Sequence, residues 1–187
     1  PPDGKTISQD IKMSINVSAL LETPSQEEET PQVVEASFNT DEVQELAKSS
    51  MDFLAALAMP SVFKYCFPDT FKRIWDWLLS YVHRTRDFSQ LAIGLPRGFG
   101  KTMAIKLFIL YTILFTKKQF ILIVCGTQTK ANNIIADIMG MLDEPNIKKT
   151  FGDWNLGAIT DRQDQKRFGF RGRNIILQGA GAGSDIR

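Results

Sequence analysis

The residues best suited to chemistry lie at positions 94–102, which read Gly-Leu-Pro-Arg-Gly-Phe-Gly-Lys-Thr. Gly98 and Gly100 permit backbone angles and a close approach that a Cβ atom forbids. At a turn that opens a helix, the backbone amides of such a loop converge on phosphate oxygens. We expect Lys101 to bind the β- and γ-phosphates of ATP and the Thr102 hydroxyl to ligate Mg²⁺. The spacing therefore predicts a nucleotide-binding loop.

One position departs from the usual spacing, which is a glycine, four residues and then Gly-Lys-Thr. Leu95 occupies the position of the first glycine, and Gly94 stands one residue too early. The alternative is a helix that begins by chance with Gly-Lys-Thr. A strand predicted at residues 90–93 and an apolar helix predicted at Lys101–Phe115 supply the context that the motif requires, so we favour the phosphate-binding loop.

The expected nucleotide contacts come from the loop and from one residue before it. Gln90 stands where some ATPases place a glutamine that reads adenine, although a strand residue with a solvated amide is the more common explanation. The loop residues expected to contact the nucleotide are Pro96, Gly98, Phe99, Gly100, Lys101 and Thr102.

Arg97 stands four residues before Lys101, inside the loop. A permanent cation at this position is within reach of the γ-phosphate, where it would stabilise the transition state of phosphoryl transfer. On this interpretation Arg97 and Lys101 are the catalytic residues of the chain. The other interpretation is an exposed loop arginine, or one paired with an acid at the sheet edge, and the residues alone leave both open.

Residues 95–102 resemble the deviant Walker A loop of the large terminase subunit of tailed bacteriophages, in which an arginine commonly stands four before the lysine and the first glycine is commonly lost. Residues 126–131 (Gly-Thr-Gln-Thr-Lys-Ala) resemble the next block of that family and the corresponding motif of helicases. Residues 151–154 (Phe-Gly-Asp-Trp) and the glycine-rich residues 179–187 resemble two further blocks. The resemblance covers about residues 88–187.

The resemblance implies an ATPase motor that uses ATP and Mg²⁺ to package viral double-stranded DNA into a capsid. It implies double-stranded DNA, a portal protein and a small terminase subunit as partners. It also implies a homo-oligomeric ring on the capsid, in the host cell cytoplasm and without a membrane. In the family, the block like residues 179–187 stands just before the Walker B strand. No apolar strand ending in paired acids follows the loop, so we expect Walker B, the catalytic glutamate and any nuclease domain beyond this chain.

Two alternatives remain. A nucleic-acid helicase or other translocase shares the loop and the block at 126–131, and its complete sequence would continue into a second RecA-like lobe. A regulatory or adaptor protein would use the same loop to bind nucleotide without hydrolysis. We expect a fragment at both ends of the chain, which alone should bind nucleotide poorly and hydrolyse it hardly at all.

The elements from residue 88 onward alternate as expected of a RecA/ASCE-like P-loop NTPase, an α/β fold with a parallel sheet flanked by helices in three layers. This domain at 88–187 is expected to be incomplete. Its periodicity predicts helices at Lys101–Phe115 and 129–142, and a buried parallel strand at 119–125. A strand at 174–178 and a tight turn at 179–183 are expected to follow an irregular segment or hairpin at 151–173.

The N-terminal half is expected to form two segments. Residues 1–40 form an acidic, flexible or extended arm with a short strand at 13–21. Residues 41–87 form a helical segment, with one helix from Thr40, its capping residue, to Met59 and a second at Asp69–Val82. The acids between positions 22 and 45 are unaccompanied by Lys or Arg, so the rest of the chain is basic despite a net charge of +1. This favours a polyanionic partner without establishing one.

Other features carry weaker hypotheses. Cys66 and Cys125 lack metal-ligand or redox spacing and are expected to be buried, reduced thiols of a cytoplasmic protein. The longest apolar run is too short to cross a bilayer. No chemistry is assigned to His83. An aromatic cluster could stack on adenine, although packing of a helix against the sheet is the safer explanation. Its residues are Phe67, Phe71, Trp75 and Trp77. A basic stretch could touch phosphates of DNA, although a charge run is more often a solvated face. Its residues are Lys166, Arg167, Arg171 and Arg173.

Overall fold

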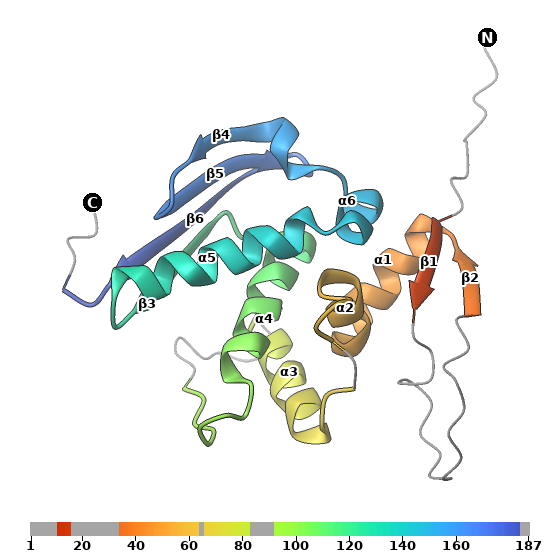
Figure 1. Cartoon of the computed structure of the whole chain (residues 1–187), viewed down its shortest axis with the longest axis horizontal. Coiled ribbons are helices and arrows are strands. Elements are labelled where there is room, and N and C mark those ends of the chain that lie inside the picture. The colour runs from red at the N-terminus through yellow and green to blue at the C-terminus, as the bar shows by residue number, and fades with distance from the viewer. Residues whose placement is uncertain (1–10, 16–33, 64–65, 83–91, 184–187) are drawn as a thin grey trace.

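Four strands from the second half of the chain form the main sheet (Figure 1). The structure is a computed structural model that describes residues 11–15, 34–63, 66–82 and 92–183. In spatial order the strands are β3 (Phe120–Cys125), β6 (Arg173–Gly181), β5 (Gln165–Phe170) and β4 (Ala158–Asp161). β3 runs parallel to β6, whereas β5 pairs antiparallel with both β6 and β4. The predicted α/β class is confirmed, but the sheet is mixed and not parallel, because the β4–β5 hairpin extends it beyond β6.

Helix α5 (Gln128–Asp143) covers one face of this sheet, and α4 (Lys101–Phe115) packs beside α5 (Figure 1). Ile123 of β3 is buried on the covered face. Phe120, Leu122 and Val124 alternate with it and are 54%, 38% and 58% exposed. The strand is therefore parallel, as predicted, but it is not buried on both faces. A three-layer core is wrong for the described part of the chain, in which the second face of the sheet carries no helical layer.

The close approach of α5 to the sheet depends on two glycines of β6. A Cβ atom on Gly179 would lie 2.9 Å from Cδ1 of Ile135, and one on Gly181 would lie 2.7 Å from the backbone nitrogen of Gln128. The sequence analysis placed both glycines in a turn after a strand at 174–178. They belong to the strand instead, which continues to Gly181 because glycine is the residue that lets the helix pack this closely.

The first helical segment consists of α1 (Thr40–Ser49) and α2 (Met51–Ala58). The single helix expected here is broken at Ser50, which has an extended backbone and whose side chain caps α2. Asn39 caps α1 in a reciprocal pair of hydrogen bonds with its first turn. The prediction that Thr40 is the cap was therefore wrong by one residue, since Thr40 is already helical.

A two-stranded sheet precedes α1. Strand β1 (Ile11–Ile15) pairs antiparallel with β2 (Val34–Phe38). The strand predicted at 13–21 starts two residues earlier, and its remaining part lies outside the described residues. β2 was not predicted. The segment that was expected to be a flexible or extended arm therefore contains, at its described positions, two paired antiparallel strands.

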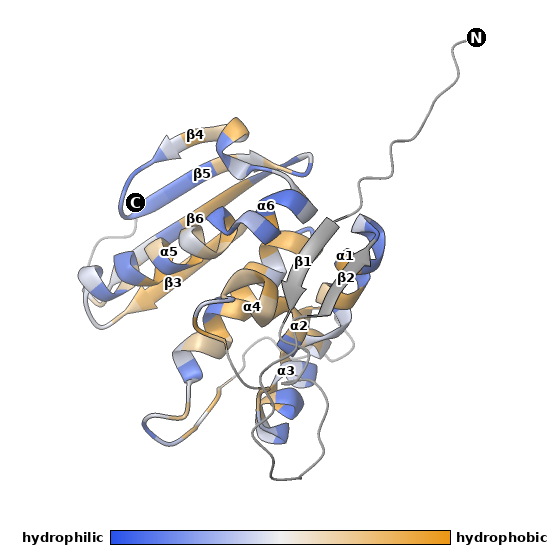
Figure 2. Cartoon of the chain, turned by 45° about the vertical axis from the view of Figure 1, so that its right-hand side comes forward, coloured by the Kyte–Doolittle hydropathy of each residue, from blue (hydrophilic) through white to orange (hydrophobic). Residues whose placement is uncertain are grey.

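Helix α3 (Asp69–Val82) has the bounds that its periodicity predicts. Phe71 and Trp75 are buried on its inner face. The Trp75 ring packs edge-on against Phe108 and Tyr111 of α4, with ring centroids 6.3 and 5.5 Å apart. The aromatic residues therefore pack α3 onto helix α4, whereas the safer explanation expected a helix packed against the sheet. Buried side chains of α1 to α6, β3, β5 and β6 form one hydrophobic cluster, and Figure 2 shows the apolar character of α4 within it.

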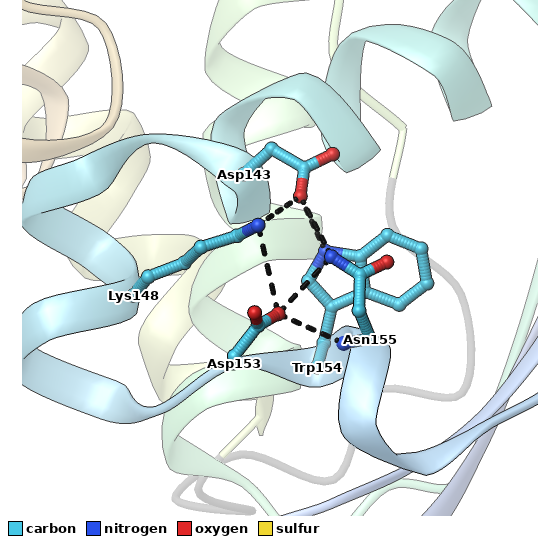
Figure 3. A network of polar contacts seen from close by, with 5 residues as sticks. All are labelled: Asp143, Lys148, Asp153, Trp154 and Asn155. Atoms are coloured by element: carbon cyan, nitrogen blue, oxygen red, sulfur yellow. Dashed lines mark hydrogen bonds and ion pairs between the residues drawn. The ribbon is translucent and has the colours of Figure 1, made fainter.

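A short helix, α6 (Pro145–Phe151), and the 3₁₀ turn η2 (Trp154–Gly157) connect α5 to the hairpin. Figure 3 shows the polar network that holds this connection. Oδ1 of Asp143 accepts hydrogen bonds from Trp154 Nε1 at 3.0 Å and Asn155 Nδ2 at 3.2 Å, and it pairs with Lys148 Nζ at 2.7 Å. The Asp153 side chain accepts from the backbone N–H of Asn155 at 3.0 Å. Neither α6 nor η2 was predicted.

The same network sets the protonation of two of its members. The hydrogen bond to Asp143 raises the pKa of Lys148 above its ordinary value. The backbone N–H of Asn155 lowers the pKa of Asp153 below its ordinary value. Because these shifts favour the charged forms, both groups stay ionised at neutral pH, and the residues 151–154 noted in the sequence have a structural explanation.

Candidate phosphate-binding loop

The loop at residues 95–102 leads directly into α4, as the motif requires. Gly98 and Gly100 have φ angles of +84° and +71°, in the left-handed region that favours glycine. Gly100 is the N-cap of α4 and provides no capping side chain. The first N–H groups of α4 are therefore without a side-chain acceptor, unlike those of α1, α2 and α5. Such a helix start can accept an anion.

Lys101 folds back over the loop. Its Nζ donates hydrogen bonds to the carbonyl oxygens of Leu95 at 2.5 Å and Pro96 at 2.6 Å. An ammonium group has three donors, so these two contacts leave one for an external acceptor. The side chain is half-buried and held in place above the start of α4. The structure thus brings the lysine, the two glycines and the uncapped helix start together.

Leu95 explains the departure from the usual spacing. Its side chain packs against the hydrophobic cluster, and its carbonyl group is the part that contacts Lys101. Its φ angle is not positive, so the backbone does not require glycine there. Of the strand predicted at residues 90–93, residues 92 and 93 are irregular, and residues 90 and 91 lie outside the described residues. Gln90, the candidate for adenine recognition, lies outside the described residues.

The other predicted loop residues are open to solvent. Arg97, Phe99 and Thr102 are exposed, so their side chains are accessible to a ligand. Among the described residues, no acid forms an ion pair with Arg97. This removes the paired-arginine explanation within that part of the chain, and leaves transition-state stabilisation and an exposed loop arginine as the two interpretations.

A series of aromatic contacts that the sequence analysis did not predict joins α3 to the loop. The Phe99 ring stacks on Phe71 of α3, with centroids 6.2 Å apart and planes 13° apart. Phe71 in turn contacts Phe67, which contacts Phe63. The four-residue spacing of these three phenylalanines was the only available signal, and it does not reveal a partner as distant in the sequence as Phe99.

An apolar cavity of about 440 Å³ lies beside the loop, between α3, α4 and β3. Among the described residues of its wall, Lys101 is the only charged one. Ile93 and Leu95 line it on the loop side, and Ile121 and Leu122 line it on the β3 side. The aliphatic part of the Lys101 side chain is therefore surrounded by apolar groups. The low dielectric constant of such surroundings strengthens the electrostatic contacts that the ammonium group makes.

The blocks at 126–131 and 179–181 meet at the carboxyl ends of β3 and β6. Gln128 joins them: its Nε2 donates to the carbonyl of Gly179 at 3.1 Å, and its Oε1 accepts from the N–H of Gly181 at 3.0 Å. Thr127 caps α5 by accepting from the N–H of Lys130 at 3.3 Å. These contacts give both blocks a structural role, and residues 184–187 lie outside the described residues.

Most of the basic stretch is engaged within the protein. Lys166 pairs with Asp161. The guanidinium groups of Arg171 and Arg173 donate to carbonyl oxygens at the C-terminus of α4. Of these four side chains, Arg167 alone has neither a hydrogen bond nor an ion pair within the described residues, and it is exposed. The stretch is therefore not a plain solvated face.

Cys66 and Cys125 are half-buried, whereas full burial was expected. His83 lies outside the described residues.

In the part of the chain that the structure describes, no group of three or more His, Cys, Asp or Glu side chains is placed to hold a metal. Thr102 is thus the described loop residue available to a magnesium ion. Within the same described residues, no helix has the length and apolar character needed to span a membrane.

Comparisons with protein-family models, curated proteins and solved structures found no match.

Proposed function

We propose that this chain binds the phosphates of ATP with Mg²⁺ at residues 95–102. The observation that carries the proposal is that Lys101, the first residue of a helix without a side-chain cap, donates hydrogen bonds to two carbonyls of the preceding loop. The start of α4 thus offers backbone N–H donors together with a cation. Among the described residues, no carboxylate forms an ion pair with Lys101. Thr102, at the first turn, would supply a hydroxyl to the metal. Gly98 and Gly100 would let the backbone approach the phosphates.

The proposed role of the complete protein is an ATPase motor that packages double-stranded DNA into a viral capsid. The resemblance of residues 95–102 to the terminase loop, including Arg97, supports this role. The proposal includes a portal protein and a small terminase subunit as partners, a ring of identical subunits, and action in the host cell cytoplasm. Hydrolysis would require acids that the described residues do not place near Lys101.

The test of nucleotide binding is an equilibrium titration with Mg·ATP of the wild-type chain and of Lys101→Ala. A lost charge-assisted contact to phosphate costs about 2–5 kcal/mol, so we expect affinity to fall at least tenfold. The fold should be retained, because the Lys101 ammonium contacts loop carbonyls and does not enter the hydrophobic cluster.

Lys130→Ala is the matched control, since Lys130 is an exposed lysine in the first turn of a different helix, α5. The two variants remove the same charge from the chain. Equal affinity of Lys101→Ala and Lys130→Ala for Mg·ATP, with both variants folded by circular dichroism, would reject the assignment.

A further inference from the structure

A second cationic site lies at the opposite end of α4 from the loop. A cavity of about 340 Å³ opens where α1, the C-terminus of α4 and the β5–β6 turn meet. The described residues of its wall include four cations, Lys48, Lys117, Arg171 and Arg173, and one carboxylate, Glu45. A helix of 15 residues separates this cavity from the loop, which corresponds to about 22 Å.

The two arginines are fixed by the end of α4. Arg173 donates to the carbonyl of Ile113 at 2.6 Å and to that of Thr116. Arg171 donates to the carbonyl of Leu114 at 3.2 Å. The carbonyl end of a helix carries partial negative charge, so it favours cations.

Arg171 has two further contacts, with Oε1 of Gln44 at 3.0 Å and with the ring of Phe151, 5.5 Å from its centroid. Each guanidinium group donates two hydrogen bonds to the described residues and has five N–H donors. Both guanidinium groups are therefore held in place before a ligand binds. Each keeps further N–H donors that a ligand could accept from.

The positive charge of the cavity is not balanced by the acids around it. Glu45 pairs with Lys48 at 3.5 Å, and both side chains are largely exposed. Lys117 is exposed and has no ion pair among the described residues. Burial lowers the pKa of Arg173, and the adjacent charge of Arg171 adds to this effect. An oxyanion in the cavity would relieve this like-charge repulsion.

We propose that this cavity binds phosphate groups of a DNA duplex. Two fixed guanidinium forks suit the several acceptor oxygens of a phosphate, and the two lysines add compact charge beside them. Lys48, Lys117 and Arg171 are exposed and line the same cavity, so all three are accessible to a polyanion at its mouth. The inference does not depend on nucleotide binding at residues 95–102.

The experiment measures binding of a short DNA duplex by fluorescence anisotropy at several salt concentrations, without nucleotide. The variant is Lys48→Gln/Lys117→Gln, which leaves the arginines on α4 in place. Each lysine that contacts a phosphate contributes about 1 to the slope of log K against log salt, so the slope should fall by about 2. Lys130→Gln/Arg162→Gln, at two exposed sites elsewhere, is the matched control.

A slope that falls equally in both double variants would overturn the proposal, because the effect would then be general. The same conclusion follows if the lysine pair changes nothing, or if Lys101→Ala abolishes duplex binding. Retained duplex binding in Lys101→Ala supports a separate site even if nucleotide binding fails. A parallel titration with inorganic phosphate identifies the source: saturation by phosphate with an unchanged DNA slope assigns the cavity to a free phosphate and rejects the duplex.

Discussion

At the scale of single residues, the two cations of the loop have different surroundings. Lys101 is half-buried and bound to loop carbonyls, whereas Arg97 is exposed. Lys101 lies on the loop itself, where the ground-state phosphates are proposed to bind, so it should contribute to affinity. A guanidinium at Arg97 that reaches the γ-phosphoryl oxygens would stabilise the transition state more than the ground state, because the charge on these oxygens redistributes there. The two residues should therefore affect affinity and turnover differently.

We predict that Arg97→Ala in the complete protein lowers ATP turnover strongly and leaves nucleotide affinity nearly unchanged. Removal of an arginine that acts on the transition state typically costs roughly 10³–10⁵-fold in turnover. Arg97→Lys should restore little, because an ammonium group cannot reproduce the planar fork. Steady-state ATPase kinetics beside a binding titration measure both quantities.

Equal losses of affinity and turnover in Arg97→Ala would make Arg97 a binding residue. If neither quantity changes, Arg97 is an exposed arginine without a role in the reaction.

At the scale of elements, the aromatic series links α3 to the loop. We predict that Phe71→Leu weakens Mg·ATP binding more than Phe115→Leu does. Leucine keeps an apolar side chain at position 71 but removes the ring on which Phe99 stacks. Phe115 also packs against other rings, Tyr111 and Phe151, but at the far end of α4. Equal affinities in the two variants, measured by titration, would show that α3 does not position the loop.

The packing of β6 on α5 gives a second prediction at this scale. Gly181→Ala should destabilise the protein by roughly 1–3 kcal/mol, because its Cβ would lie 2.7 Å from the backbone nitrogen of Gln128. Gly140→Ala, on the open side of α5 with nothing within 4 Å, should stabilise it by about 0.5–1 kcal/mol. Urea unfolding followed by tryptophan fluorescence measures both changes.

If Gly181→Ala is as stable as the wild type, the glycine-rich segment is not the close helix contact that the structure describes.

Elements with a strong period were predicted well, and those that depend on tertiary contacts were not. α3 has the predicted bounds because its apolar stripe is long and helical in period. α4 has them because a long apolar segment follows directly on the glycine-rich loop. The end of β6 was missed because glycines read locally as a turn, whereas here they admit α5. The break at Ser50 was missed because an apolar period continues through it. In the site, Lys101 followed from the motif, but the support from Phe71 depends on a contact between distant segments.

At the scale of the whole molecule, the N-terminal helices and the sheet share one hydrophobic cluster. We predict that they unfold in a single transition, since neither part buries its apolar residues without the other. Trp75 and Trp154, buried in α3 and η2, report on the two regions. Urea unfolding of Trp75→Phe and of Trp154→Phe is followed by fluorescence and by far-ultraviolet circular dichroism. Within each variant, the two probes should give the same midpoint. Separate fluorescence and dichroism midpoints within one variant would contradict a shared core.

The central claim of this account is that residues 95–102 bind triphosphate. Amide chemical shifts of the ¹⁵N-labelled chain, recorded during titrations with Mg·ATP and separately with Mg·AMP, test it at residue resolution even if binding is weak. The account predicts that Mg·ATP shifts the amides of Gly98, Gly100, Lys101 and Thr102 in a saturable way. Mg·AMP should shift them far less, because it lacks the β- and γ-phosphates. Unchanged loop amides at saturating Mg·ATP, or equal responses to the two nucleotides, would contradict the claim.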